Sequence, residues 1–252
     1  EHITLAARAG KPIFSEKPLA DTVAKAAAAA DAVRSTAVPF QIGFQRRYDR
    51  SYARARELIA SGAIGDIEMF RGMSCDRLGP IEFLRTSGGL FMDLASHDFD
   101  AARFLTGQEV VDVLAIGAVL VEPELATFDD IDYGIVLLRF ANGTEASLHL
   151  DYYQRPPSHT LEITCEEGRV CWDNASGEAR VYRASAESPV LLVPPEGFDR
   201  NQMFLDEMAA FLRLCGGENL PHCTLADGIR VQEIVQAVKQ SASQEGCMVR
   251  LG

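Results

Sequence analysis

Two successive patterns divide this 252-residue sequence, and the change between them constrains the fold more than any other feature. Over roughly the first 74 residues, helical and extended segments alternate, which is typical of βαβ units. From residue 112 onward, extended segments follow one another directly, which indicates hairpins. The sequence therefore predicts an α/β part followed by an α+β part, in which an open, mostly antiparallel sheet carries helices on one face.

The first part is expected to open inside a helix, because residues 1–10 have the pattern of a helix end that stops at Gly10. The further elements expected here are a strand over 12–15, a helix over 22–34, a strand over 39–44, a helix over 49–61 and a strand over 67–74. No fold begins naturally inside a helix, so we expect other residues to precede Glu1 in the intact protein.

The second part contains two clear turn signals. Asn142-Gly143 separates the extended segments 133–140 and 145–153, and Glu166-Glu167-Gly168 separates 160–164 from 170–172. Further strands are expected over 179–183 and 190–193, and helices over 203–214 and 226–241. We find no internal repeat or flexible linker.

Charge and apolar patterning exclude several classes of partner. The formal net charge is −12, and the longest basic group is the pair Arg46-Arg47, so neither nucleic acid nor an anionic membrane is an expected partner. No signal peptide and no membrane-spanning apolar run is present, which favours a cytoplasmic protein.

The six cysteines include no CxxC pair, and the five histidines have no ligand spacing. We therefore expect no metal site, no disulfide framework and free thiols in a reducing cytoplasm. One alternative stays open, because Cys165 and Cys171 could approach each other across a hairpin.

Two fragments carry the residue types that proton and hydride chemistry needs. Ser15-Glu16-Lys17-Pro18 supplies a lysine after a strand, and residues 88–98, GGLFMDLASHD, supply Asp93 and His97. Asp93 and His97 lie four positions apart in a helical stretch and share one face, which Asp100 is expected to extend.

Together with Gly43-Phe44-Gln45-Arg46-Arg47-Tyr48-Asp49 and the run GGLFMDLASHDFDAARFLTG, the Glu16-Lys17-Pro18 segment resembles the Gfo/Idh/MocA family of glucose-fructose oxidoreductases and inositol dehydrogenases. The inositol 2-dehydrogenase branch is the nearest. The likeness spans nearly the whole chain, in the family's order and spacing. It implies an NAD(P)-dependent dehydrogenase with a Rossmann domain followed by a sheet domain for substrate binding and oligomerisation.

On this resemblance, residues 1–46 are the C-terminal remnant of the Rossmann domain and residues 47–252 form the sheet domain. The last Rossmann helix is expected either at 226–241 or at 90–106. One departure is large, because no GxGxxG phosphate loop occurs anywhere in the sequence. We therefore expect the chain as given to be a fragment that binds no dinucleotide with useful affinity. The alternative is a natural truncated protein with a non-catalytic binding or oligomerisation role.

The resemblance implies catalytic roles for Lys17, Asp93 and His97. Lys17 would stabilise the developing alkoxide, and His97 would accept the hydroxyl proton, since imidazole titrates near neutral pH. Asp93 could hold the substrate, orient the imidazole or raise its basicity. Taken singly, these side chains could also be a solvated loop lysine, a helix cap and a half-buried histidine.

The remaining expected contacts are assigned by the same resemblance. The expected cofactor contacts are Glu16, Lys17, Pro18 and Arg46, and the expected substrate contacts are Gln45, Arg46, Arg47, Asp76, Tyr153 and Arg155. Arg77 is a weaker candidate beside Asp76, whereas Asp98 and Asp100 are adequately explained as helix surface charges. The segment 151–159 could equally be a structural loop held by two prolines.

The predicted reaction is oxidation of a secondary hydroxyl of a cyclic polyol or sugar, with NAD as hydride acceptor and NADP as the alternative. A free sugar or a nucleotide sugar is the alternative substrate, because segment 151–159 resembles sugar-modifying members of the family. A homo-oligomer, dimer or tetramer, is expected through the sheet domain.

Overall fold

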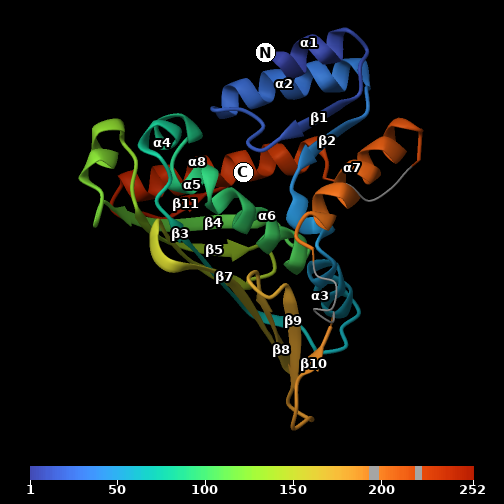
Figure 1. Cartoon of the computed structure of the whole chain (residues 1–252), viewed down its shortest axis with the longest axis vertical. Coiled ribbons are helices and arrows are strands. Elements are labelled where there is room, and N and C mark those ends of the chain that lie inside the picture. The colour runs from blue at the N-terminus through green and yellow to red at the C-terminus, as the bar shows by residue number, and fades with distance from the viewer. Residues whose placement is uncertain (193–198, 219–222) are drawn as a thin grey trace.

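A small parallel sheet forms the first layer of the structure, a computed structural model that describes residues 1–192, 199–218 and 223–252 (Figure 1). Strands β1 (Ile13–Glu16) and β2 (Phe40–Gly43) pair in parallel, and helices α1 (His2–Arg8) and α2 (Val23–Thr36) accompany them. The hydroxyl of Thr22 caps α2, and the left-handed Ala37 ends it. The alternating pattern of the sequence is thus confirmed as a βαβ unit.

Nine strands form the second sheet, in the order β10-β9-β8-β7-β3-β6-β5-β4-β11. The strands are β3 (Ile67–Arg77), β4 (Val110–Ala118), β5 (Tyr133–Phe140), β6 (Glu145–Asp151), β7 (Tyr153–Cys165), β8 (Gly168–Asp173), β9 (Glu178–Arg183), β10 (Val190–Leu191) and β11 (Val249–Arg250). Neighbours are antiparallel except β3 and β6, which are parallel. The prediction of an open, mostly antiparallel sheet is therefore confirmed.

Both predicted hairpins form, and the pairing corrects two details. Strand β3 continues to Arg77, three residues beyond the expected end, because it pairs with β7 as far as Tyr153. Across the β7–β8 hairpin, Cys171 lies opposite Glu162 and not beside Cys165, and all six cysteines are free. Of the strand expected over 190–193, β10 covers the first two residues, and residue 193 lies outside the described residues.

The remaining helices are α3 (Arg50–Ala60), α4 (Ile81–Ser87), α5 (Leu90–Asp93), α6 (Ala95–Thr106), α7 (Gln202–Cys215) and α8 (Leu225–Ser243), with short 3-10 turns η1 (Gln45–Tyr48) and η2 (Pro123–Phe128). Helices α3, α5, α6 and α8 pack on one face of the large sheet, as predicted, whereas α7 packs against η1 and β2. Helix α8 lies between the two sheets and contacts α2, β2 and β4 (Figure 1). No helix of the described chain has both the length and the apolar character needed to cross a membrane.

Candidate active site

A cavity of about 380 Å³ lies where the two sheets and the helices meet. Seven residues singled out from the sequence line it: Lys17, Gln45, Arg46, Asp76, Arg77, Asp93 and His97. They come from the end of β1, from η1, from the end of β3 and from α5 and α6. Since β1 and β2 are parallel, Lys17 and Gln45 follow carboxyl ends of neighbouring strands, where open α/β sheets bind ligands.

Lys17 is held firmly against the cavity wall. Its Nζ donates hydrogen bonds to Asp93 Oδ1 at 2.9 Å and to the Asp93 backbone oxygen at 2.6 Å. The lysine side chain is 15 % exposed and the aspartate side chain 28 %, so both groups remain accessible from the cavity. The ammonium is therefore fixed next to the space that a ligand would occupy, and Asp93 is what fixes it.

His97, in the first turn of α6, shares this cavity, and its Nδ1 is buried without a hydrogen-bond partner in the described chain. Burial lowers the pKa of His97 well below its ordinary value, and the positive charges of Arg46 and Lys17 lower it further. The imidazole is therefore neutral near pH 7, and a neutral imidazole can accept a proton.

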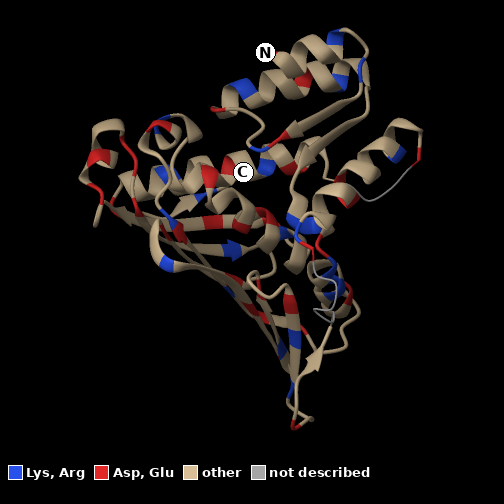
Figure 2. Ribbon diagram, viewed as in Figure 1, with Lys and Arg blue, Asp and Glu red and all other residues tan. Residues whose placement is uncertain are grey.

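Arg46 is oriented by Asp98, whose Oδ1 accepts hydrogen bonds from Arg46 Nη1 at 2.7 Å and from Ser74 Oγ at 2.8 Å. Asp98 is buried, so its interpretation as a helix surface charge is wrong. The neighbouring η1 and α6 bring these charges together (Figure 2). Asp98 thus ties η1 to α6 and holds the guanidinium close to His97.

Arg47 was expected in the cleft, but it lies outside the cavity lining. Its Nε donates to Asp100 Oδ2 at 2.9 Å, and its Nη2 donates to Asp100 Oδ1 at 2.5 Å and to Asp227 Oδ1 at 2.9 Å. Asp100 is only 1 % exposed, so it is neither a surface charge nor part of the face that Asp93 and His97 present. Arg103 joins the same buried cluster through Asp227.

The segment 151–159 contributes to the cavity through residues other than the expected ones. Tyr153 and Arg155 do not line it, and Arg155 is exposed on β7. Instead Tyr152 lines it, because neighbouring residues of extended chain point to opposite sides. The Tyr152 hydroxyl is buried without a partner in the described chain, and burial raises its pKa.

His159, from the same segment, adds a second imidazole. Its Nε2 lies 3.5 Å from Asp76 Oδ2, and its Nδ1 is buried with no partner among the described residues. Burial lowers the pKa of His159, and Arg46 lowers it further. Two neutral imidazoles therefore face one cavity.

Other lining residues carried no recognisable signal in the sequence. They are Trp172 and Asn174 near the end of β8, Phe83 and Leu84 of α4, and Arg200, Met203 and Phe204 around the start of α7. None of these belongs to a motif, since only the folding of distant segments brings them together. The cavity thus combines polar groups with aromatic rings.

Of the expected cofactor contacts, Lys17 and Arg46 line the cavity, whereas Glu16 and Pro18 do not. The Glu16 carboxylate instead lies over Gly43, where a Cβ would come within 2.7 Å of its Oε2. Lys17 and the unpartnered imidazoles fit the reactive end of a nicotinamide dinucleotide. No GxGxxG sequence is available among the 252 residues for its pyrophosphate.

Comparisons with known proteins agree with the family resemblance that the sequence motifs indicated. Residues 52–171 match the GFO/IDH/MocA C-terminal domain. The chain is 34% identical over 246 residues to the uncharacterized oxidoreductase YrbE of Bacillus subtilis (strain 168). This alignment covers 94% of this chain and 70% of that protein. It is 29% identical over 264 residues to the myo-inositol 2-dehydrogenase of Thermotoga maritima, with 97% of this chain and 74% of that protein covered.

Among solved structures, levoglucosan dehydrogenase in complex with NADH superposes with a TM-score of 0.89 at 26% identity, over 99% of this chain and 76% of that chain. The likeness in sequence and the likeness in fold thus extend over almost all of this chain. The chain belongs to the Gfo/Idh/MocA family of oxidoreductases.

Proposed function

We propose that the 380 Å³ cavity binds a cyclic polyol or sugar and that this chain carries the proton-transfer groups of an NAD-dependent dehydrogenase. One observation carries the proposal: the ammonium of Lys17, the carboxylate of Asp93 and the neutral imidazole of His97 face the same cavity. Relatives that act on inositol support this substrate class.

The chemistry assigned to each residue follows from its surroundings. His97 accepts the proton of the reacting secondary hydroxyl, because its lowered pKa keeps a ring nitrogen free. Lys17 donates a hydrogen bond to the same oxygen and stabilises the negative charge that develops there. Asp93 is a positioning residue, since it holds the ammonium through two oxygens. In the reverse direction, His97 returns the proton.

When bound, NAD supplies the hydride acceptor. Lys17 and Arg46 would hold its nicotinamide end, with Glu16 and Pro18 shaping the loop after β1. NADH in a related structure supports NAD over NADP as the cofactor. The division into a nucleotide-binding part, 1–46, and a substrate part, 47–252, is part of this proposal. The contacts of α8 with α2 and β2 favour 226–241 as the last helix of the nucleotide-binding part.

Sugar substrates are the second candidate. The NADH complex of levoglucosan dehydrogenase superposes with a TM-score of 0.89, compared with 0.82 for a myo-inositol 2-dehydrogenase from Lactobacillus plantarum. The aromatic side chains of the lining can pack on the CH face of a sugar ring or of a cyclic polyol ring. The imidazoles and guanidinium groups can form hydrogen bonds with hydroxyls of either substrate.

A homo-oligomer is proposed through the open face of the large sheet. Met69, Met73, Ile116 and Leu137 are large apolar side chains that remain exposed on these strands. A second copy would remove them from water. The six free thiols favour a reducing cytoplasm, and the net charge of −12 disfavours nucleic acid as a partner.

The decisive experiment uses the protein expressed from its complete reading frame. Myo-inositol, scyllo-inositol, levoglucosan and free hexoses are offered with NAD or NADP, and nicotinamide absorbance is followed. We expect saturable NAD reduction with a cyclic polyol or sugar, reduced about a hundredfold in His97→Ala. Polyol binding without turnover under all these conditions would favour the non-catalytic alternative and contradict the proposal.

A further inference from the structure

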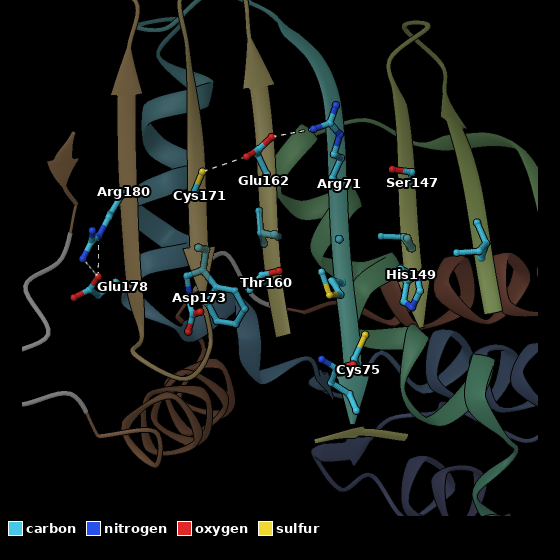
Figure 3. A pocket seen from close by; sticks show the side chains of 17 residues that line it. Arg71, Cys75, Ser147, His149, Thr160, Glu162, Cys171, Asp173, Glu178 and Arg180 are labelled. Atoms are coloured by element: carbon cyan, nitrogen blue, oxygen red, sulfur yellow. Dashed lines mark hydrogen bonds and ion pairs between the residues drawn. The ribbon is translucent and has the colours of Figure 1, made fainter. Parts of the chain in front are cut away.

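A second and larger hollow, of about 800 Å³, lies on the face of the nine-stranded sheet away from the helices (Figure 3). Its lining comes from strands β3 and β5–β9 and contains none of Lys17, Asp93 and His97. At one end of it, Cys75 and His149 lie close together on neighbouring strands (Figure 3). These two side chains are separate from the candidate active site, and both are metal-ligand types.

The strand register explains why a third ligand type joins them. Strands β3 and β6 are parallel, with Cys75 opposite Asp151 and Met73 opposite His149. Because side chains alternate along a strand, His149 and Asp151, two positions apart, point to the same face. Thiol, imidazole and carboxylate are thus brought together from two segments that are distant in the sequence.

The three groups are close enough for one ion. One potential ligand atom of each lies within 4.8 Å of the others, and His149 Nε2 is 3.3 Å from Asp151 Oδ2. Zinc binds such ligands at about 2.0–2.3 Å, which places the ligand atoms of one tetrahedral ion roughly 3.5 Å apart. Small side-chain rotations therefore suffice to complete the site.

Two of the three ligands are already oriented by neighbours. Asp151 Oδ1 accepts hydrogen bonds from the backbone N–H of Tyr153 at 3.1 Å and of Gln154 at 3.0 Å, which leaves Oδ2 to face His149. The His149 ring packs edge-on against Tyr133, with ring centroids 5.3 Å apart. Such outer contacts hold metal ligands in place in known sites.

Burial and access also suit a bound ion. Cys75 and Asp151 are buried, whereas the His149 side chain is 41% exposed and faces the hollow. The ion would therefore have buried ligands on one side and the hollow on the other. Thiolate with imidazole selects zinc-like divalent ions over magnesium or calcium, which prefer oxygen ligands only.

We propose that Cys75 Sγ, His149 Nε2 and Asp151 Oδ2 bind one zinc-class divalent cation, whose fourth coordination position faces the hollow. The Cys75 thiol releases its proton to solvent as the sulfur–metal bond forms, and nothing is oxidised or reduced. The ion joins β3 to β6 directly behind Asp76, the next residue along β3, which lines the candidate active site. It therefore braces the strand end that carries one wall of that cavity.

Cobalt(II) is the probe, added to chelator-treated protein. We expect one equivalent to bind with a thiolate-to-cobalt charge-transfer absorption, and zinc to displace it. Cys75→Ser abolishes this absorption. His149→Ala lowers cobalt affinity by about tenfold or more. Cys171→Ser is the matched control, since Cys171 lines the same hollow but lies opposite Glu162, and this variant keeps both the absorption and the affinity.

Three outcomes overturn the site: native protein that binds no cobalt, an absorption that persists in Cys75→Ser, or one that disappears in Cys171→Ser. If circular dichroism shows that Cys75→Ser does not fold, His149→Ala decides, because this side chain is partly exposed and its removal leaves the sheet intact. Unchanged cobalt affinity in folded His149→Ala would then refute the proposal.

Discussion

Two neighbouring arginines face opposite regions of the molecule, and the contrast between those regions separates function from structure. Behind the cavity, Arg47, Asp100 and Asp227 form a buried cluster in which opposite charges satisfy one another. In the cavity, by contrast, Nδ1 of His97 and the Tyr152 hydroxyl are buried without partners in the described chain. A fully paired region stabilises the fold, whereas unpaired polar groups at a cavity await a ligand.

The largest expected effect falls on the paired region. Arg47→Met leaves the buried Asp100 carboxylate without its main partner, so the free energy of unfolding should fall by about 3–5 kcal/mol in urea titrations at pH 7. The matched control is Arg54→Met, because Arg54 pairs with Glu57 on the exposed surface of α3 and should change that free energy by less than about 0.5 kcal/mol. Equal losses in the two variants would contradict the contrast.

In the cavity, substitutions should lower activity and leave the free energy of unfolding nearly unchanged. In the protein from the complete reading frame, His97→Ala and Lys17→Ala should each reduce kcat/KM by about two orders of magnitude, because each removes a group that acts on the reacting oxygen. Urea titrations should find the free energy of unfolding nearly unchanged for His97→Ala. Near-normal turnover in either variant would remove that residue from the mechanism.

Glu207 of α7 offers a test that depends on pH. It is buried, and burial, with the charges of Glu16 and Asp100, raises its pKa to about 8. A carboxyl whose folded pKa is raised stabilises the fold fully below its unfolded pKa, and this contribution is lost as the pH rises through the folded value. Glu207→Gln should therefore increase the free energy of unfolding by about 3–5 kcal/mol at pH 9 and change it little at pH 4, since one pKa unit corresponds to about 1.4 kcal/mol.

The same urea titrations at several pH values check this prediction for Glu207. The increase should appear gradually between the ordinary pKa of 4.5 and the raised value of about 8. If the difference in the free energy of unfolding between Glu207→Gln and the native protein is independent of pH, the pKa of Glu207 is not raised in the folded state.

The smallest expected effect concerns the coupling of the two regions. Arg46 is the second largest cause, after burial, of the lowered pKa of His97. Arg46→Gln should raise that pKa by no more than about one unit, which shifts the acidic limb of the kcat/KM profile to higher pH. Asp100→Asn, in the paired region, should leave the limb where it is. If the acidic limb shifts in Asp100→Asn but not in Arg46→Gln, the assignment of Arg46 to the cavity and of Asp100 to the paired cluster is wrong.

The sequence predicted much of this contrast, but not all of it. Lys17, Asp93 and His97 were identifiable because they belong to two short motifs, Glu16-Lys17-Pro18 and the helical run from Gly88, that resemble those of the family. The sequence could not show that Arg46 lines the cavity whereas Arg47 does not. One partner of Arg47, Asp227, comes from α8, 180 residues along the chain. A pattern that contains no long-range contact cannot distinguish two adjacent arginines in a short 3-10 turn.

Strand register was the other missing information. An offset of one residue decides that Tyr152, and not Tyr153, lines the cavity. Likewise, the pairing of β3 with β6 brings Cys75 to His149 and Asp151, although no ligand spacing exists along the chain. The hairpin turns were predictable, but the insertion of β3 between β6 and β7 was not, since consecutive strands are usually neighbours.

The account depends most on a neutral His97 at the cavity, and a histidine NMR titration measures this directly, with His97→Gln to assign the resonance. We predict that His97 stays uncharged at its ordinary pKa of 6.5 and protonates only well below it. A His97 resonance that titrates at 6.5 or above would contradict its assignment as the group that accepts the substrate proton at neutral pH.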